Sequence, residues 1–278
     1  SSMGALSASG HATRRRLFVP YLPNWPKIPP AYCYRCWYGK EYPRCDLACA
    51  WELERTLKME GDEYVSMFIA EPIVGSALGT VPAPKEYFEI IREICDKHEV
   101  LFCVDEVMTG FGRTGRNFGI EHWGVLPDLM VCAKGMTSGY MPMGAVIVSE
   151  KIHDAFGEHL AQVGSTYSAH PTACAVSLAV INYIVKKKLV QNVANLEARF
   201  IDGLRRMIDH KSVGDVRGKG FFAGIEFVKD KNTKEMFETT VRFNRRIQNQ
   251  CWNNGLTIYV GTDPILGVVG DNIQIAPM

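Results

Sequence analysis

A lysine and an aspartate each follow an apolar run of the sequence. Asp105 comes directly after residues 100–104, and Lys134 comes directly after residues 129–133. Such runs predict buried parallel strands, whose carboxyl ends meet at the edge of a sheet where small ligands bind. A lysine there can form a Schiff base with an aldehyde cofactor, and an aspartate can keep a pyridine nitrogen protonated. The pair indicates imine chemistry, although a turn aspartate and a solvated lysine would explain the same residues.

The elements that must position this pair alternate between strands and helices. This order predicts an α/β fold with a mainly parallel sheet covered by helices. We predict strands at 64–70, 100–104, 129–133 and 144–148, and helices at 46–58, from Pro84 onward and at 171–185.

The pattern changes after residue 187. A helix with one apolar face is followed by a strand at 221–228, a helix at 239–253, and short strands at 256–260 and 272–275. We expect a large cofactor-binding domain over residues 1–187 and a smaller α+β domain over residues 188–278.

Composition excludes several classes of function. The 278 residues include 31 basic and 30 acidic side chains, and this balance gives no field for binding nucleic acid. No run of about 18 apolar residues occurs, so we expect no membrane span. Nine cysteines, several in apolar runs, fit reduced thiols and a cytoplasmic location.

Residues 110–115 read G-F-G-R-T-G and match the glycine fingerprint of dinucleotide-binding folds, which would suggest an oxidoreductase. That fingerprint needs a helix to begin within it and hold a pyrophosphate. Gly119, Gly124 and Pro127 interrupt the residues that follow. We therefore expect a tight loop beside a ligand.

Four cysteines gather in and after a proline-rich stretch. Cys33, Cys36, Cys45 and Cys49 have the spacing C-x2-C-x8-C-x3-C. Four thiolates can close a tetrahedral zinc site. Reduced thiols in a surface loop or a redox-labile disulfide would explain the same residues, and a noncatalytic metal-binding module is the alternative function that this cluster suggests.

Several motifs together resemble a class III pyridoxal-phosphate aminotransferase, and the resemblance covers essentially the whole chain. The motifs are V-D-E-V-M-T-G-F-G-R-T-G at 104–115, P-D at 127–128, A-K-G at 133–135 with the residues 139–146, S-T-Y at 165–167 and H-P at 170–171. The resemblance implies the fold-type I architecture of pyridoxal-phosphate-dependent transferases, with a large sheet domain and a smaller terminal lobe.

The resemblance also implies residue roles. Lys134 would be the Schiff-base lysine that moves the proton, and Asp105 would pair with the pyridinium nitrogen of pyridoxal 5′-phosphate. Val107 would press on one face of the ring. Thr166 would reach a phosphate in the neighbouring subunit, which requires a homodimer with shared active sites.

Three positions depart from the pattern of many members. Met108 stands where many have a Gln that donates to the cofactor's phenolic oxygen. Ser76 and Gln274 stand where members that handle amino-acid carboxylates have a Glu and an Arg that form a switchable ion pair. Because a neutral Gln lacks the guanidinium fork, we expect an amine, diamine, taurine-like or omega-amino donor.

The family's phosphate-binding loop and ring-stacking aromatic residue would lie upstream of Ser1, and its small lobe would continue past Met278. We therefore expect a fragment that binds the cofactor poorly by itself. For the parent protein we expect transfer of an amino group from such a donor to a 2-oxo acid such as pyruvate. An aminomutase, phospho-lyase or epimerase of the same fold is the alternative.

Overall fold

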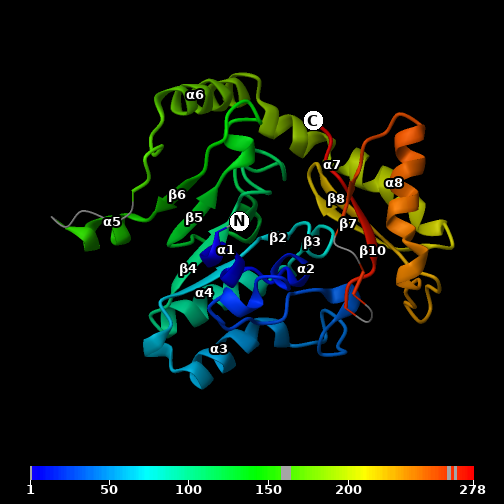
Figure 1. The fold of residues 1–278 in the computed structure, drawn as a ribbon, viewed down its shortest axis with the longest axis horizontal. Coiled ribbons are helices and arrows are strands. Elements are labelled where there is room, and N and C mark those ends of the chain that lie inside the picture. The colour runs from blue at the N-terminus through cyan, green and yellow to red at the C-terminus, as the bar shows by residue number, and fades with distance from the viewer. Residues whose placement is uncertain (1, 158–163, 262–263, 266–267) are drawn as a thin grey trace.

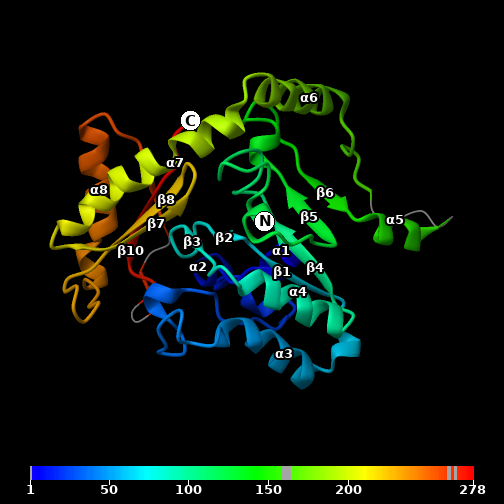
Figure 2. The same ribbon diagram turned by 180° about the vertical axis from the view of Figure 1, so that it is seen from behind.

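The computed structural model describes residues 2–157, 164–261, 264–265 and 268–278. Within these residues, two four-stranded sheets lie side by side (Figure 1), and the view from behind shows the same arrangement (Figure 2). The helices are α1 (Met3–Ala8), α2 (Ala12–Arg15), α3 (Ala48–Glu60), α4 (Tyr87–Lys97), α5 (Glu150–Phe156), α6 (Pro171–Lys186), α7 (Leu189–Arg205) and α8 (Phe243–Asn253). None of those formed by the described residues has the length and apolar character needed to cross a membrane.

The first sheet has the strand order β1-β4-β5-β6, with β1 at Met67–Ala70, β4 at Leu101–Asp105, β5 at Leu129–Cys132 and β6 at Ala145–Val148. The pairs β1–β4 and β4–β5 are parallel, while β6 runs antiparallel to β5. This agrees with the mainly parallel sheet expected from the sequence. The strand predicted at 64–70 is shorter than expected, because residues Asp62–Tyr64 form a 3-10 turn before it.

One face of this sheet is densely packed against α3 and α4, which lie below it in Figure 1. The apolar residues of α4 recur at helical spacing, so Phe88, Ile91 and Ile94 all point inward and are fully buried. Phe88 stacks on Phe102 of β4, with ring centroids 5.9 Å apart. Burial of several such side chains, at about 1.5–3 kcal/mol each, anchors β4 and with it Asp105. β6 is less covered, and its residue Val146 is 60% exposed.

The second sheet is antiparallel throughout and has the order β7-β8-β10-β9. Its strands are β7 (Val213–Lys219), β8 (Phe222–Phe227), β9 (Tyr259–Val260) and β10 (Asp271–Ile275), and a small hairpin of β2 (Ile73–Val74) and β3 (Val81–Pro82) lies between the sheets. Every residue of β8 is buried. All strands of this sheet come after residue 187 and those of the first sheet before it, and the boundary at 187/188 stays a prediction.

A network of buried charges ties the second sheet to the N-terminal part of the chain. Arg217 of β7 forms ion pairs with Asp215 at 2.7 Å and with Glu226 of β8 at 2.9 Å. Glu226 also accepts a hydrogen bond from Tyr32 and pairs with Arg35 Nε at 2.5 Å. Because each charge faces an opposite one, the group can stay ionised without water.

The loop at 110–115 supports the junction of the two sheets and starts no helix. Arg113 donates to the carbonyl oxygens of Phe221 and Pro277, at 3.2 and 2.5 Å. Gly115 of the motif, with φ +82°, packs against α7, where a β-carbon on it would come within 3.0 Å of the Ala194 Cα. The glycines of the motif thus serve close chain packing, and the requirement for a dinucleotide fingerprint is not met.

Candidate active site

The carboxyl ends of β1, β4 and β5 bring three ionisable residues together. Ala70 pairs with Val104, so Glu71 and Asp105 leave neighbouring strands side by side. Asp105 pairs in turn with Val131 of β5, and Lys134 follows that strand. Burial lowers the pKa of Lys134, and the carboxylates of Asp105 and Glu71 oppose that shift, so the three groups lie within electrostatic range of one another. The structure therefore brings Lys134 and Asp105 together, as the sequence pattern predicts.

Lys134 begins a 3-10 turn, Lys134–Met136, and has a left-handed backbone with φ +41°. Such a conformation is uncommon for a residue with a side chain and is typical of functional sites. Its Nζ lies 2.7 Å from the Met108 sulfur. Partial loss of water around the amine lowers the pKa of Lys134, and this effect outweighs the two carboxylates, which raise it. The amine is therefore more readily deprotonated than that of a fully solvated lysine.

Asp105 is the last residue of β4 and is half-buried. Its Oδ1 accepts a hydrogen bond from the N–H of Val107 at 3.0 Å, which fixes the carboxylate at the start of the following turn. Val107 and Met108 are both half-buried in that turn. These residues place an acceptor, an apolar branched side chain and a thioether close to one amine.

Glu71 is a residue of this site that the sequence analysis did not select. Its Oε2 accepts a hydrogen bond from the N–H of Gly75 at 2.9 Å. Burial raises the pKa of Glu71 to about 7, and the Asp105 carboxylate adds to that shift while Lys134 opposes it. The available signal was its position after an apolar run, which is the same pattern that selected Asp105.

Glu106 is a second residue that was missed, and it is completely buried. It accepts hydrogen bonds from the hydroxyl of Thr109 and from the backbone N–H groups of Gly119 and Ile120, the latter two at 2.8 Å. These bonds hold the loop after β4 against the sheet. Glu106 thus positions the turn that carries Val107 and Met108.

The family model "Aminotransferase class-III" matches residues 1–269. The chain belongs to the class III aminotransferases. It is 36% identical to the uncharacterized aminotransferase YodT of Bacillus subtilis (strain 168) over 283 residues, which cover 99% of this chain and 63% of that protein. It is 39% identical to the putrescine–pyruvate aminotransferase of Pseudomonas aeruginosa over 249 residues, covering 87% of this chain and 52% of that protein.

Solved structures give the same assignment. An amine transaminase from an uncultivated Pseudomonas species, described as PLP-bound, matches with a TM-score of 0.91 and 31% identity, covering 99% of this chain and 62% of that one. Similarity at this level shows that the fold is that of the fold-type I aminotransferases. The chain spans between 52% and 63% of the length of these three proteins.

Thr166 of this class III aminotransferase is exposed in the turn that precedes α6. Among the described residues, no hydrogen bond joins Thr166 to Lys134 or Asp105. Its expected contact with a phosphate in a neighbouring subunit stays a prediction.

Gln274 occupies a buried position on β10, where its amide Nε2 donates to Thr80 Oγ1 at 3.0 Å. The amide of this side chain is therefore buried and already hydrogen-bonded within the protein. Ser76, the other departure noted in the sequence, is half-buried in the turn between β2 and β3. Neither residue carries a charge that could bind a carboxylate.

The alternative metal-binding function is not supported. Across residues 2–157, 164–261, 264–265 and 268–278, no group of three or more candidate ligand side chains is arranged to hold a metal ion. Cys33 is exposed and Cys45 is buried. The described residues therefore give no support to the zinc hypothesis from the cysteine spacing.

Proposed function

We propose that the protein transfers an amino group from an amine or omega-amino donor to a 2-oxo acid such as pyruvate, using pyridoxal 5′-phosphate. The observation that carries the proposal is the placement of Lys134 and Asp105 at adjacent strand ends in a class III aminotransferase. An amine beside a carboxylate is the donor set that this cofactor requires from a protein.

The residues present fit the cofactor. When bound, it supplies a protonated pyridine ring that accepts electrons from the substrate carbon. Asp105 would hold the proton of the ring nitrogen, since its carboxylate is fixed by the Val107 N–H and half-buried at the strand end. Val107 would contact one face of the ring. Met108 would lie near the phenolic oxygen without donating a hydrogen bond to it.

Lys134 would act twice. Its lowered pKa makes the neutral, nucleophilic amine more available, so it can hold the cofactor covalently between turnovers. With the cofactor bound, the free Nζ would act as general base toward the substrate carbon and would then give the proton back as general acid. The two carboxylates nearby, Glu71 and Asp105, stabilise the ammonium that forms in between.

The donor class follows from the charge of the pocket. Gln274 is neutral and bonded to Thr80, so it cannot serve as a switchable cation for an amino-acid carboxylate. The relative from Pseudomonas aeruginosa is named for putrescine, a diamine. We propose an amine, diamine or omega-amino donor on these two grounds.

We also propose a homodimer and a cytoplasmic location. Apolar side chains remain exposed on β6 and α6, where Val146 and Val185 are 60% and 71% exposed, and a second subunit would cover them. Thr166 is exposed as well. The nine cysteines are all unpaired, which fits a reducing compartment.

The test is alanine formation from pyruvate in the presence of putrescine or another amine. Excess pyridoxal 5′-phosphate is supplied throughout the assay. Donor-dependent alanine supports the transaminase. Conversion of the donor without alanine, with the cofactor trapped on Lys134 by borohydride, would instead indicate an aminomutase, lyase or epimerase.

A further inference from the structure

The side chain of Glu71 is held in place by the turn that follows β1. Its Oε2 accepts a hydrogen bond from the N–H of Gly75 at 2.9 Å. Gly75 leaves room for this contact, because a β-carbon at that residue would lie 3.2 Å from the same oxygen and 3.4 Å from Met108 Cγ. The Glu71 carboxyl and the Met108 side chain therefore lie around one point, the α-carbon of Gly75.

Met108 connects this carboxyl to the proposed catalytic amine. Its sulfur lies 2.7 Å from Lys134 Nζ, while its Cγ lies beside the turn that holds Glu71. Because Cγ and the sulfur are directly bonded, the carboxyl and the amine both lie close to one short side chain. Contacts within the protein thus place Glu71 near Lys134.

The strand register places a second carboxyl next to the first. Ala70 of β1 pairs with Val104 of β4, so Glu71 and Asp105 leave adjacent parallel strands, which lie about 4.8 Å apart in a sheet. Two carboxyls this close repel each other when both are ionised, so one of them keeps its proton to a higher pH. Glu71 is that carboxyl, since burial and the Asp105 charge raise its pKa to about 7.

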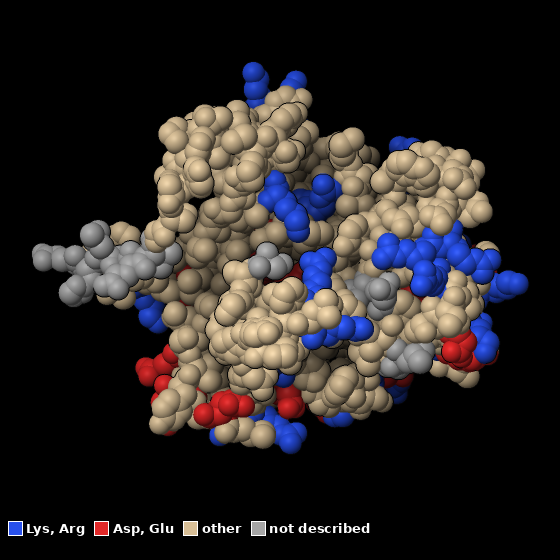
Figure 3. Space-filling view, in the orientation of Figure 1, with Lys and Arg blue, Asp and Glu red and all other residues tan. Residues whose placement is uncertain are grey.

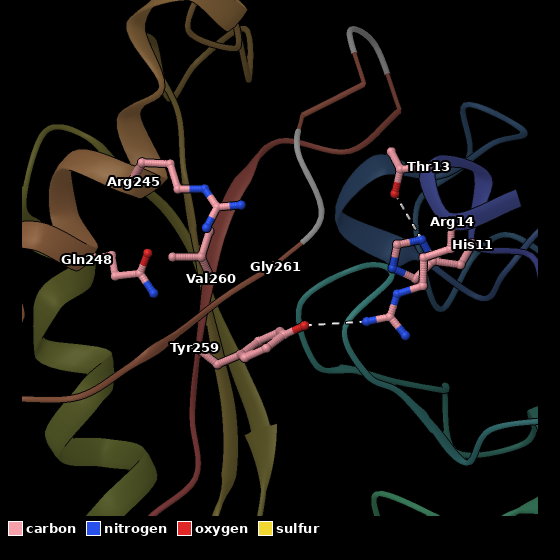
Figure 4. A pocket seen from close by; sticks show the side chains of 8 residues that line it. All are labelled: His11, Thr13, Arg14, Arg245, Gln248, Tyr259, Val260 and Gly261. Atoms are coloured by element: carbon pink, nitrogen blue, oxygen red, sulfur yellow. Dashed lines mark hydrogen bonds between the residues drawn. The ribbon is translucent and has the colours of Figure 1, made fainter. Parts of the chain in front are cut away.

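The other charged groups in range of Glu71 are Lys134 and Arg14, and both oppose this rise in its pKa. Arg14 points elsewhere: Figure 4 shows its guanidinium 3.4 Å from the Tyr259 hydroxyl, in a cavity of about 240 Å³ that Glu71 does not line. Figure 3 shows acidic side chains mainly along the lower part of this face, over α3, which lies below the first sheet. The neighbours that govern Glu71 are therefore those of the site.

We propose that Glu71 regulates the basicity of Lys134 through its own proton. While the Glu71 carboxyl is neutral, the amine faces one carboxylate, that of Asp105. Once Glu71 ionises, the amine faces two carboxylates and holds its proton more tightly. Glu71 is a positioning residue, because it acts through Lys134. This inference rests on the proposed function and adds a regulation of the same site by pH.

The first experiment uses the protein without cofactor. The rate at which acetic anhydride labels Lys134 is measured from about pH 5 to about pH 9. We expect Glu71→Gln to be labelled as fast as wild type below about pH 6, and about 3- to 30-fold faster above about pH 8, the range for one nearby opposite charge. A structural disturbance would instead change the ratio of the two rates equally at every pH.

The control is Glu89→Gln, which makes the same chemical change at an exposed carboxylate of α4. Its labelling rate at Lys134 should equal that of wild type at every pH. Glu71→Asp keeps a carboxyl at the site, and its rates should lie closer to wild type than those of Glu71→Gln.

The second experiment follows the glutamate carboxyl carbons by NMR, also without cofactor. One signal should titrate at about pH 7 in wild type and be missing in Glu71→Gln. In Asp105→Asn this signal should titrate at a lower pH, because a neighbouring negative charge is removed. If Glu71→Gln does not fold, the shift between wild type and Asp105→Asn carries the test. No glutamate signal titrating between about pH 6 and 8 would overturn the proposal.

Measured transamination distinguishes this inference from the function itself. A labelling ratio that stays constant with pH, in a protein that transaminates, would refute the role of Glu71 and leave the transaminase intact. A pH-dependent ratio without any transamination would keep the coupling between Glu71 and Lys134 and refute the proposed reaction. With both present, the ratio of kcat/KM between Glu71→Gln and wild type should also change between about pH 6 and 8.

Discussion

The sheet β1-β4-β5-β6 places its ionisable residues Glu71, Asp105 and Lys134 at or just beyond its strand ends. The sheet β7-β8-β10-β9 instead places Arg217 and Glu226 inside its strands. In the second sheet each buried charge faces an opposite charge at 2.5 to 2.9 Å. In the first, two carboxylates share one amine, and the pKa of Glu71 rises to about 7. Paired charges stabilise the fold. An ionisable group that lacks a full set of opposite charges, and whose pKa lies near 7, is available for chemistry.

The topology explains this difference. Parallel strands end at one edge, so residues that follow them converge on a ligand without interrupting the sheet. Antiparallel strands end alternately at both edges of the sheet. A charged residue inside such a strand therefore needs an oppositely charged or hydrogen-bonding group, either within the sheet or in a segment packed against it. Tyr32 and Arg35 supply that partner from the N-terminal part of the chain. Substitutions at four residues would test this division of roles.

The largest effect is expected at Lys134. Lys134→Ala should lower kcat by at least about 10²- to 10⁴-fold, the contribution of a positioned acid–base group, and should abolish covalent cofactor attachment. Because the side chain is exposed and forms no ion pair among the described residues, the thermal midpoint should change little. Activity is followed as alanine formation, and unfolding by circular dichroism. Retained borohydride-trapped cofactor in the variant would contradict the assignment.

The opposite behaviour is expected at Glu226. Glu226→Ala leaves Arg217 and Arg35 without their buried partner, so the free energy of unfolding should fall by about 3–5 kcal/mol. Glu235→Ala removes an exposed ion pair with Lys229 and is the control, and its loss of stability should be much smaller than that of Glu226→Ala. Urea denaturation measures both. Equal losses would mean that the second sheet does not depend on its buried charges.

Glu71 should make stability depend on pH in a defined direction. Its pKa is raised from 4.5 to about 7 in the folded protein, so the folded state binds the proton more tightly than the unfolded state. The free energy of unfolding should therefore fall as the pH rises from about 5 to 8, by about 2–3 kcal/mol relative to Glu71→Gln. Glu89→Gln, an exposed carboxylate on α4, should show the wild-type profile. Parallel profiles for wild type and Glu71→Gln would refute the buried, protonated carboxyl.

The smallest effect is expected at Met108. Its sulfur lies 2.7 Å from Lys134 Nζ, so a side chain here reaches the amine. Met108→Gln introduces an N–H donor, and we expect cofactor affinity to rise about 2- to 10-fold, the range for one neutral hydrogen bond. Met108→Leu keeps the volume without a donor and should leave affinity unchanged. Cofactor binding is measured by the absorbance of the lysine-bound form. A loss of affinity with Gln would show that Met108 does not face the phenolic oxygen.

Much of the fold could be predicted because its strands carry continuous apolar runs. The runs before Asp105 and Lys134 form β4 and β5 nearly as expected. β7 was not predicted, since its sequence V-G-D-V-R-G-K alternates charges and glycines that look like a loop. The strand can bury Arg217 because the guanidinium donates hydrogen bonds to Glu226 and to the carbonyl of Gly79. A strand stabilised by distant partners has no local signature.

The sequence by itself determined which residue types leave the ends of neighbouring strands, because apolar periodicity and strand termination are local properties of the chain. The tertiary structure alone decided how those groups are charged. Burial raises the pKa of Glu71, and Arg14 arrives beside Tyr259 from the opposite end of the sequence. Desolvation and Coulomb interactions depend on distance through space, which the spacing of residues along the chain does not contain.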